Sequence, residues 1–234
     1  MSKIELMQRA VSITTEIPIN KFKSGNMDES DWRVYNNAVS NMMNENLTII
    51  DQAGISLNKV KKIAKKHALK HDLRFIYIDY LQLMTNNIKG SNREQEISSI
   101  SRGLKQLAKE LKIPVVALAQ LSRSVEQRGG DKRPFLSDLR ESGSIEQDAD
   151  TVQFLYRPEY YDLMEDAEGN STQGLGYLMV AKNRHGAVRD IPMRFKAECT
   201  KFMDKVDDFE FNNIPLPTSN DFDDFPTEDY GAPF

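Results

Sequence analysis

Apolar side chains recur at helical spacing in two stretches near the start of the chain. In the first, they repeat every three or four residues from Ile4 to Ile17, and Pro18 predicts the end of the helix. The second begins after Asp28, a residue type that accepts hydrogen bonds from the first turn of a helix. We expect three apolar side chains to share one face of this second helix: Trp32, Val39 and Met42.

Two further helices are predicted downstream. Ser56 is placed to cap one that runs to about Lys70, with inward positions at Leu57, Val60, Ile63 and Ala64. The opposite face of this helix carries lysines that we expect to be solvated: Lys59, Lys61, Lys62, Lys65 and Lys66. A longer helix follows a polar stretch, and its apolar positions are Ile97, Ile100, Leu104, Leu107, Ala108 and Leu111.

Short apolar runs between the helices predict strands. Residues 74–79 and 114–118 are two such runs, and the longest predicted helix lies between them. Strands that are apolar on both faces and alternate with helices are typical of a parallel α/β sheet, covered on both sides. Two more strands are expected, a short one at 47–50 and another at 151–156, and His185-Gly186 predicts a hairpin turn.

Composition narrows the class of protein. The 234 residues are 39% hydrophobic and 28% charged, as in an ordinary water-soluble domain. No run of the sequence reaches 18 apolar residues, so we expect no membrane span and a cytoplasmic location. Cys199 is the single cysteine of the sequence, which excludes an internal disulfide and a cysteine-rich metal site.

Charge is distributed unevenly. Residues 204–234 carry nine acids and one lysine, so this segment has a formal charge of −8 and the remainder +4. We expect 1–203 to form the folded domain and 204–234 a disordered acidic tail. A mildly basic body is compatible with a polyanionic partner but does not require one.

Asp79 is the first candidate for chemistry. It ends the apolar run 74–79, and ligands of parallel α/β sheets bind at the edge formed by the carboxyl ends of the strands. A carboxylate there can hold the magnesium ion that bridges nucleotide phosphates. Many strands end in an Asp that only forms a turn, so this position alone leaves both roles open.

Four sequence blocks extend this interpretation. They are Ile-Asp-Tyr-Leu-Gln-Leu-Met at 78–84, Ile-Pro-Val-Val-Ala-Leu-Ala-Gln-Leu-Ser-Arg at the start of 113–128, Asp-Leu-Arg-Glu-Ser-Gly-Ser-Ile-Glu-Gln-Asp within 131–150, and Lys-Asn-Arg-His-Gly at 182–186. In this order, the blocks resemble the motor domain of DnaB-type replicative DNA helicases. The resemblance covers about residues 1–202, and the block within 131–150 is the most specific.

The resemblance implies an α/β fold with a RecA-like P-loop NTPase core that uses ATP and Mg²⁺. It implies that Asp79 holds the metal ion and that Gln120 contacts the γ-phosphate. It further implies that Lys182 and Arg184, two residues apart on a strand and therefore pointing the same way, reach the γ-phosphate of a neighbouring subunit.

The resemblance also implies contacts to single-stranded DNA. Arg140, Glu141 and Gly143 match family positions at the DNA backbone, although an acid such as Glu141 is unusual there and could instead orient Arg140 or a neighbouring subunit. Arg123 and Arg128 are weaker candidates, because they lie in a Gly-containing basic loop that the resemblance places in the channel of a ring. Contacts of this kind follow phosphates without reading bases.

One motif expected of this family is absent from the 234 residues. A P-loop requires Gly-x-x-x-x-Gly-Lys-Ser/Thr, and none of the twelve glycines is followed by lysine. We therefore expect a motor domain that is incomplete on its N-terminal side and inactive in isolation. Such a domain would need an upstream fragment that carries the P-loop.

The resemblance implies a component of a hexameric, ATP-dependent replicative helicase that translocates on single-stranded DNA and unwinds duplex at the fork. Its partners would be other helicase subunits, primase and a helicase loader. Two alternatives remain open from the sequence: a non-catalytic fragment that regulates or poisons helicase rings, and a RecA- or RadA-like recombinase.

Overall fold

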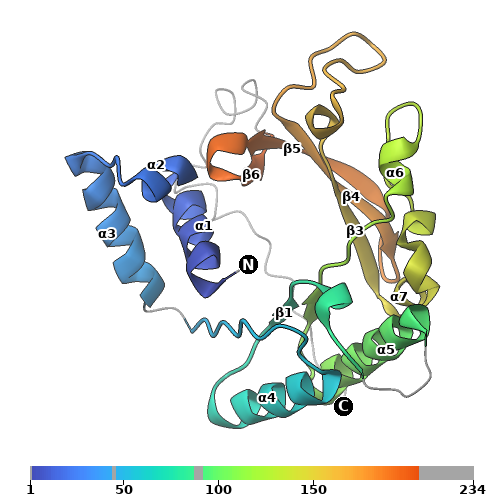
Figure 1. Ribbon diagram of the computed structural model, residues 1–234. Coiled ribbons are helices and arrows are strands. Elements are labelled where there is room, and N and C mark those ends of the chain that lie inside the picture. Colours follow the sequence, from blue (N-terminus) through green and yellow to red (C-terminus); the bar gives the residue numbers. More distant parts are fainter. Residues whose placement is uncertain (1, 44–45, 87–91, 206–234) are drawn as a thin grey trace, which may run out of the picture. The chain divides into compact units, whose positions relative to one another are not determined.

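A computed structural model describes residues 2–43, 46–86 and 92–205 (Figure 1). Of the acidic tail predicted for 204–234, only 204–205 belong to the described residues. None of the described helices is long and apolar enough to cross a membrane.

Three helices occupy the N-terminal part. α1 (Lys3–Thr15) begins with a capping box between Ser2 and Glu5, and it is followed by Pro18 as predicted. α3 (Glu29–Met43) confirms the second predicted helix, because the Asp28 carboxylate accepts a hydrogen bond from the backbone N–H of Asp31 at 2.8 Å. Between them lies α2 (Ile19–Ser24), which the sequence pattern did not predict.

The three apolar residues predicted to share one face of α3 differ in burial. Trp32 is 47% exposed, whereas the side chain that α3 buries is Ala38. Trp32 instead lies edge-on to Tyr35 at the helix surface, with their ring centroids 5.6 Å apart.

The α/β part follows the predicted order of helix, strand, helix and strand. α4 (Leu57–Lys70) is capped by Ser56, whose side chain accepts from the N–H of Lys59. It leads to β1 (Ile76–Ile78) and a 3₁₀ turn, η1 (Leu81–Leu83). α5 (Arg93–Leu111) and β2 (Val115–Ala117) follow, and β1 pairs with β2 in parallel.

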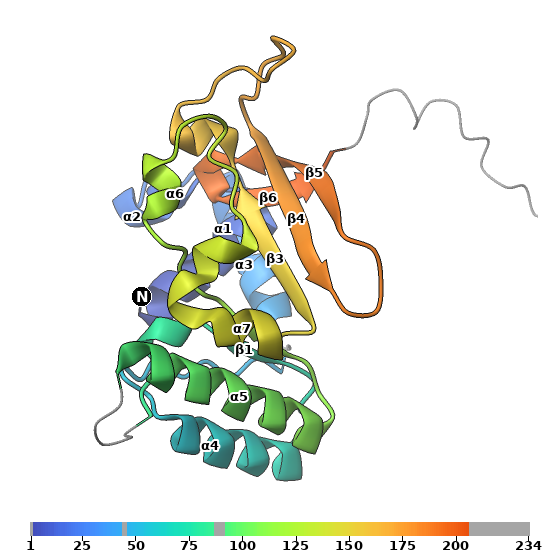
Figure 2. The same ribbon diagram turned by 90° about the vertical axis from the view of Figure 1, so that its right-hand side faces the viewer.

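α4 and α5 lie side by side in both ribbon views (Figures 1 and 2). Gly103 of α5 permits the close approach: a Cβ at this position would lie 2.3 Å from Leu57 Cδ2 of α4. The helices enclose one hydrophobic core, whose buried members are Leu57, Ala64, Leu81, Met84, Ile100, Leu104 and Leu107.

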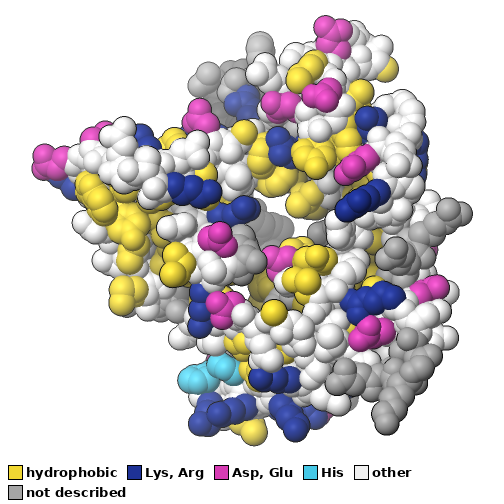
Figure 3. Space-filling model, viewed as in Figure 1, with side chains coloured by type: hydrophobic (Ala, Val, Ile, Leu, Met, Phe, Trp, Pro, Cys, Tyr) yellow, Lys and Arg dark blue, Asp and Glu magenta, His cyan; other side chains and the backbone are white. Residues whose placement is uncertain are grey.

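The outer face of α4 carries the lysines predicted to be solvated. Dark blue side chains gather over α4 in Figure 3. Most of them are exposed, and Lys65 forms an ion pair of 2.6 Å with Glu110 of α5.

The prediction that the parallel strands are buried on both faces is wrong for the described residues. Ile76, Ile78, Val115 and Ala117 pack on the core between α4 and α5. The opposite face is exposed, with relative exposures of 52% for Phe75, 71% for Tyr77, 39% for Val116 and 52% for Leu118. We call these four residues the exposed sheet face.

A second sheet contains β3 (Thr151–Tyr156), β4 (Leu175–Asn183), β5 (Arg189–Lys196) and β6 (Lys201–Asp204) in that order. β4 pairs antiparallel with both β3 and β5, so the parallel pattern does not extend to this sheet. The predicted hairpin at His185-Gly186 is confirmed. A second core lies under this sheet, and its buried members are Leu139, Val152, Phe154, Tyr156 and Met179.

Short helical elements connect the two sheets and the strands of the second one. They are α6 (Ser124–Gln127), η2 (Leu136–Ser142), α7 (Gly143–Asp148), η3 (Pro158–Tyr161) and η4 (Ala197–Cys199). The predicted strand at 47–50 is wrong, since these residues form no strand and Leu47 and Ile50 are 59% and 47% exposed.

Candidate functional site

The carboxyl ends of β1 and β2 meet at one edge of the parallel sheet. Ile78 is in register with Ala117, so the chain leaves the two strands side by side. Asp79 follows β1 directly and Gln120 lies three residues after β2, and both are exposed. The structure thus brings both residues predicted to serve the nucleotide to the edge where parallel sheets bind ligands.

Gln82 links these two chain segments. Its side-chain Nε2 donates to the carbonyl oxygen of Gln120, and its Oε1 accepts from the backbone N–H of Gln120, both at 3.2 Å. One side chain therefore fixes both backbone polar groups of Gln120. Gln82 belongs to the block 78–84, but no feature of the sequence singles it out within that block.

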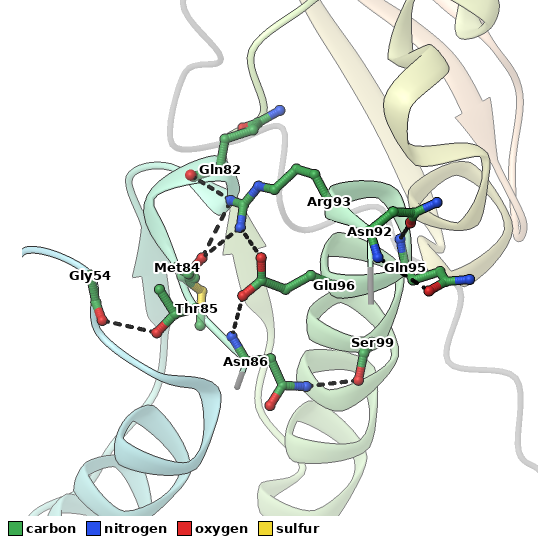
Figure 4. A network of polar contacts seen from close by, with 10 residues as sticks. All are labelled: Gly54, Gln82, Met84, Thr85, Asn86, Asn92, Arg93, Gln95, Glu96 and Ser99. Carbon is green, nitrogen blue, oxygen red and sulfur yellow. Dashed lines mark hydrogen bonds and ion pairs between the residues drawn. The ribbon is translucent and has the colours of Figure 1, made fainter. Parts of the chain in front are cut away.

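Arg93 at the start of α5 holds the turn after β1 from the other side (Figure 4). Its guanidinium donates to the carbonyl oxygen of Gln82 at 2.6 Å and also reaches the carbonyl oxygen of Met84. It pairs with Glu96 one turn along α5. Glu96 in turn accepts from the backbone N–H of Asn86 at 2.7 Å, and this bond is the main reason that its pKa lies below the usual value.

The loop after Gln120 is organised around Asp138, which is only 3% exposed. Its carboxylate accepts from the backbone N–H of Phe135 at 2.7 Å and pairs with Arg128. The Arg128 guanidinium lies 4.9 Å from the centre of the Phe135 ring and donates to the carbonyl oxygen of Arg133 at 2.9 Å. Arg128, a predicted DNA contact, is therefore engaged within its own loop, whereas Arg123 is exposed.

The remaining predicted DNA contacts lie where η2 meets α7. The side chains of Arg140 and Glu141 lie outside the described part of the chain. Gly143 is exposed, has φ −50° and ψ −23°, and has no heavy atom within 4 Å of the position that a Cβ would occupy. Neither its backbone conformation nor its surroundings within the described residues require glycine.

The prediction that Lys182 and Arg184 share a strand is wrong, because β4 ends at Asn183 and Arg184 lies in the turn that follows, but both side chains reach neighbouring carbonyl groups of α7. Lys182 Nζ donates to the carbonyl oxygen of Glu146, and Arg184 Nη2 to that of Gln147. These carbonyls lie in the last turn of α7, where cations are favoured by the helix dipole. Arg184 Nη1 also lies 3.6 Å from Asp150 Oδ1.

Asp150 joins this region to α5. Its carboxylate forms an ion pair with Lys105, and this contact is the main cause that lowers its pKa; Arg184 and His185 add smaller effects of the same sign. The sequence places Asp150 at the end of the block 131–150 and indicates no particular role for it. In the structure it connects α5 with the end of β4.

A parallel strand pair that packs on two helices, is followed by Asp79 and Gln120 and leads into a basic loop is the arrangement expected of a RecA-like ATPase domain. Comparison with known proteins gives the same class. Residues 1–204 match the DnaB-like helicase C terminal domain. The chain therefore belongs to that family of replicative helicase domains.

Individual relatives agree with the family match. The chain is 39% identical over 216 residues to the replicative DNA helicase DnaC of Bacillus subtilis, with 92% of this chain and 46% of that protein covered. It is 40% identical over 214 residues to the replicative DNA helicase DnaB of Rickettsia felis, with 86% and 43% covered. The chain thus spans less than half the length of these relatives.

Solved structures confirm the fold. A DnaB-like replicative helicase, described together with its interactions with primase, has a TM-score of 0.80 and 39% identity, covering 87% of this chain and 48% of that one. A second solved structure, an ATPase domain, has the same score and identity, covering 87% of this chain and 71% of that domain.

Proposed function

We propose that this chain forms part of the motor of a hexameric replicative helicase, which hydrolyses ATP to translocate on single-stranded DNA and unwind duplex at the fork. The observation that carries the proposal is the placement of Asp79 and Gln120 at one edge of the parallel sheet, in a chain of the replicative helicase family. That family supports a role in DNA replication rather than recombination.

The residues at the sheet edge fit a magnesium–nucleotide complex in part. An exposed carboxylate such as Asp79 is the kind of oxygen ligand that Mg²⁺ takes, with water and substrate phosphates completing its shell. Gln120 offers a neutral amide to the terminal phosphate. The 234 residues supply no P-loop, so ATP would be held mainly by a segment that carries one.

ATP with Mg²⁺ would supply the phosphoryl group that is transferred to water. In our proposal Lys182 and Arg184 act on the nucleotide of a neighbouring subunit, where a cation stabilises charge as the phosphoryl group leaves. Their hydrogen bonds to α7 carbonyls bring both cations to the same place, at the end of β4. When a neighbouring subunit packs against this surface, Lys182 and Arg184 would release the α7 carbonyls and donate to the phosphate oxygens of its nucleotide instead.

For DNA we propose contacts from Arg140 and Gly143, with Glu141 orienting Arg140 or a neighbouring subunit, and Arg123 as an additional phosphate contact. Among the described residues, no heavy atom lies within 4 Å of the position that a Cβ of Gly143 would occupy, and a backbone without a side chain can let a phosphate approach closely. Arg128 is better placed to support the loop through Asp138 than to touch DNA. Primase and a helicase loader are further partners that we propose from the family.

The test uses this chain joined to, or co-expressed with, a segment that carries a P-loop; we call this assembly the completed motor. Single-stranded DNA should stimulate its ATP hydrolysis, and Asp79→Asn should abolish the Mg²⁺-dependent turnover. Asp72→Asn is the matched control, because Asp72 is an exposed carboxylate that pairs with Arg74, two residues away. Undiminished turnover in Asp79→Asn would overturn the proposed metal role.

A further inference from the structure

The parallel ladder between β1 and β2 continues beyond the last paired residues. The N–H of Leu118 donates to the carbonyl oxygen of Ile78, and the N–H of Leu81 donates to that of Leu118, both at 2.9 Å. The chain then turns into η1, where the N–H of Leu83 bonds within the turn to Tyr80. Among the described residues, the next contact from this turn to the segment after β2 is made by a side chain.

The side chain of Gln82 takes over at this point. A primary amide carries one carbonyl acceptor and an N–H donor, the same pair that a peptide unit presents to a neighbouring strand. Gln82 uses both on the same residue, Gln120, at 3.2 Å each. It therefore acts as one more rung of the ladder, made by a side chain.

Arg93 fixes the other side of Gln82. Its guanidinium binds the carbonyl oxygen of Gln82 while its partner Glu96 binds the N–H of Asn86, so both ends of the turn are tied to the first turns of α5 (Figure 4). Asn86 adds a side-chain hydrogen bond to Ser99 at 2.8 Å. Gln82 is thus held by α5 through its backbone and holds Gln120 through its side chain.

We propose that Gln82 is a positioning residue for Gln120, and that Arg93 anchors it to α5. The inference rests on the proposed function, in which Gln120 contacts the terminal phosphate. Gln120 lies at an exposed strand end, where an unsupported side chain would lose conformational freedom on meeting a phosphate. Two hydrogen bonds to its backbone fix the position of Gln120 and the direction of its Cα–Cβ bond beforehand, which favours catalysis by preorganisation.

The side chain at position 82 can be changed in ways that separate its two bonds. Gln82→Glu keeps an acceptor for the N–H of Gln120 but puts a carboxylate oxygen against its carbonyl group. Gln82→Met keeps the length and removes both bonds. Gln106→Glu is the matched control, since Gln106 lies on the exposed surface of α5.

We expect both Gln82 variants of the completed motor to lower kcat roughly tenfold and to leave the KM for ATP within about twofold, because each hydrogen bond contributes modestly. Gln106→Glu should match the unmodified protein. Hydrogen exchange should accelerate at the N–H of Gln120 in Gln82→Met while the N–H of Leu104 in the core stays protected. This pattern would separate lost positioning from misfolding.

The double variant gives the decisive comparison. If Gln82 acts through Gln120, Gln82→Met should reduce kcat no further once Gln120→Ala is present. Gln120→Ala with full turnover would overturn the proposed role of Gln120 and this inference with it. A strong effect of Gln120→Ala, combined with normal turnover in the Gln82 variants or with fully additive losses, would overturn the inference alone.

Discussion

The proposed role of Arg184 at the nucleotide of a neighbouring subunit can be tested with a single substitution. Its guanidinium lies on the carbonyl of Gln147 and near Asp150, at the exposed end of β4. If it also serves a neighbouring subunit, Arg184→Ala in the completed motor should leave nucleotide binding nearly intact and lower hydrolysis by roughly 10³ or more, the scale of arginine-finger removal.

Mixed rings identify whose site is damaged. Arg184→Ala subunits should impair the site of their neighbour and not their own, as measured by turnover against the ratio of mixed subunits. Arg189→Ala is the control, since Arg189 is exposed at the start of β5 on the same hairpin. Normal turnover in Arg184→Ala rings would rule out the trans role.

Arg140 makes a different prediction, because a phosphate contact carries no sequence information. Arg140→Ala should weaken single-strand binding about equally for all base compositions and lower the salt slope of log K by about 0.7. Fluorescence anisotropy with labelled oligonucleotides at several salt concentrations measures both. Arg33→Ala on exposed α3 should change neither, and a base-dependent loss in Arg140→Ala would contradict the assignment.

At the scale of elements, local signals predicted much of the fold. Ser56 and Asp28 cap helices because their side chains bond nearby N–H groups, a property fixed within three residues of sequence. The hairpin at His185-Gly186 follows from equally local turn chemistry. The strand predicted at 47–50 is wrong because an apolar pattern does not show whether a partner strand is present.

The site was predictable only where chemistry and strand order coincide. Asp79 and Gln120 follow neighbouring parallel strands, so the order of the strands in the sequence predicts that they lie at one edge. The bonds of Gln82 to Gln120 and of Arg93 to Gln82 join residues 38 and 11 positions apart. No spacing rule relates such positions, and only the tertiary fold shows that they meet.

The contacts of Asp138 within its loop lead to a prediction about the free energy of unfolding. Asp138→Ala would leave Arg128 half-buried without its carboxylate and the N–H of Phe135 without its acceptor. Removing one partner from a buried pair is costly, so we expect a loss of about 2–3 kcal/mol in the free energy of unfolding. Denaturant titration measures it, and Asp72→Ala on the surface should change it by at most about 0.5 kcal/mol.

The ion pairs of Glu16, at the end of α1, lead to a prediction about how the stability of the fold depends on pH. Hydrogen bonds from Lys201 and then Lys196 lower its pKa from 4.5 to about 2. A carboxyl whose pKa is depressed by folding stabilises the fold above its unfolded pKa, and this contribution is lost as pH falls toward 2. The stability difference between the unmodified protein and Glu16→Gln should therefore be constant at neutral pH and shrink between pH 4.5 and 2.

Thermal unfolding at a series of pH values would measure this difference. Glu29→Gln is the matched control, because Glu29 is an exposed carboxylate that pairs with Arg33 on the same helix. Its effect should be small across the same range of pH. A difference for Glu16→Gln that persists unchanged to pH 2 would show that the two lysines do not depress the pKa of Glu16.

At the scale of the whole molecule, the exposed sheet face and the motif content of the chain lead to one prediction. ATP affinity in P-loop ATPases comes largely from backbone amides and a lysine that cradle the phosphates, and the 234 residues contain no such motif. Asp79 offers Mg²⁺ a single carboxylate, and the ion normally depends on phosphates to complete its shell. The isolated 234-residue polypeptide should therefore show no measurable ATPase or unwinding, even with DNA.

The same polypeptide should be poorly soluble, because Phe75, Tyr77, Val116 and Leu118 expose an apolar surface over two paired strands. Co-expression with a P-loop-bearing segment should restore both solubility and turnover if that segment packs on this face. Tyr77→Lys separates the two effects, since it should improve the solubility of the isolated chain but impair assembly of the completed motor.

DNA-stimulated hydrolysis by the isolated chain would show that it binds ATP by another route and would refute the interpretation that the motor needs an added P-loop. Inactivity that persists with the added segment would instead favour a non-catalytic chain that regulates helicase rings.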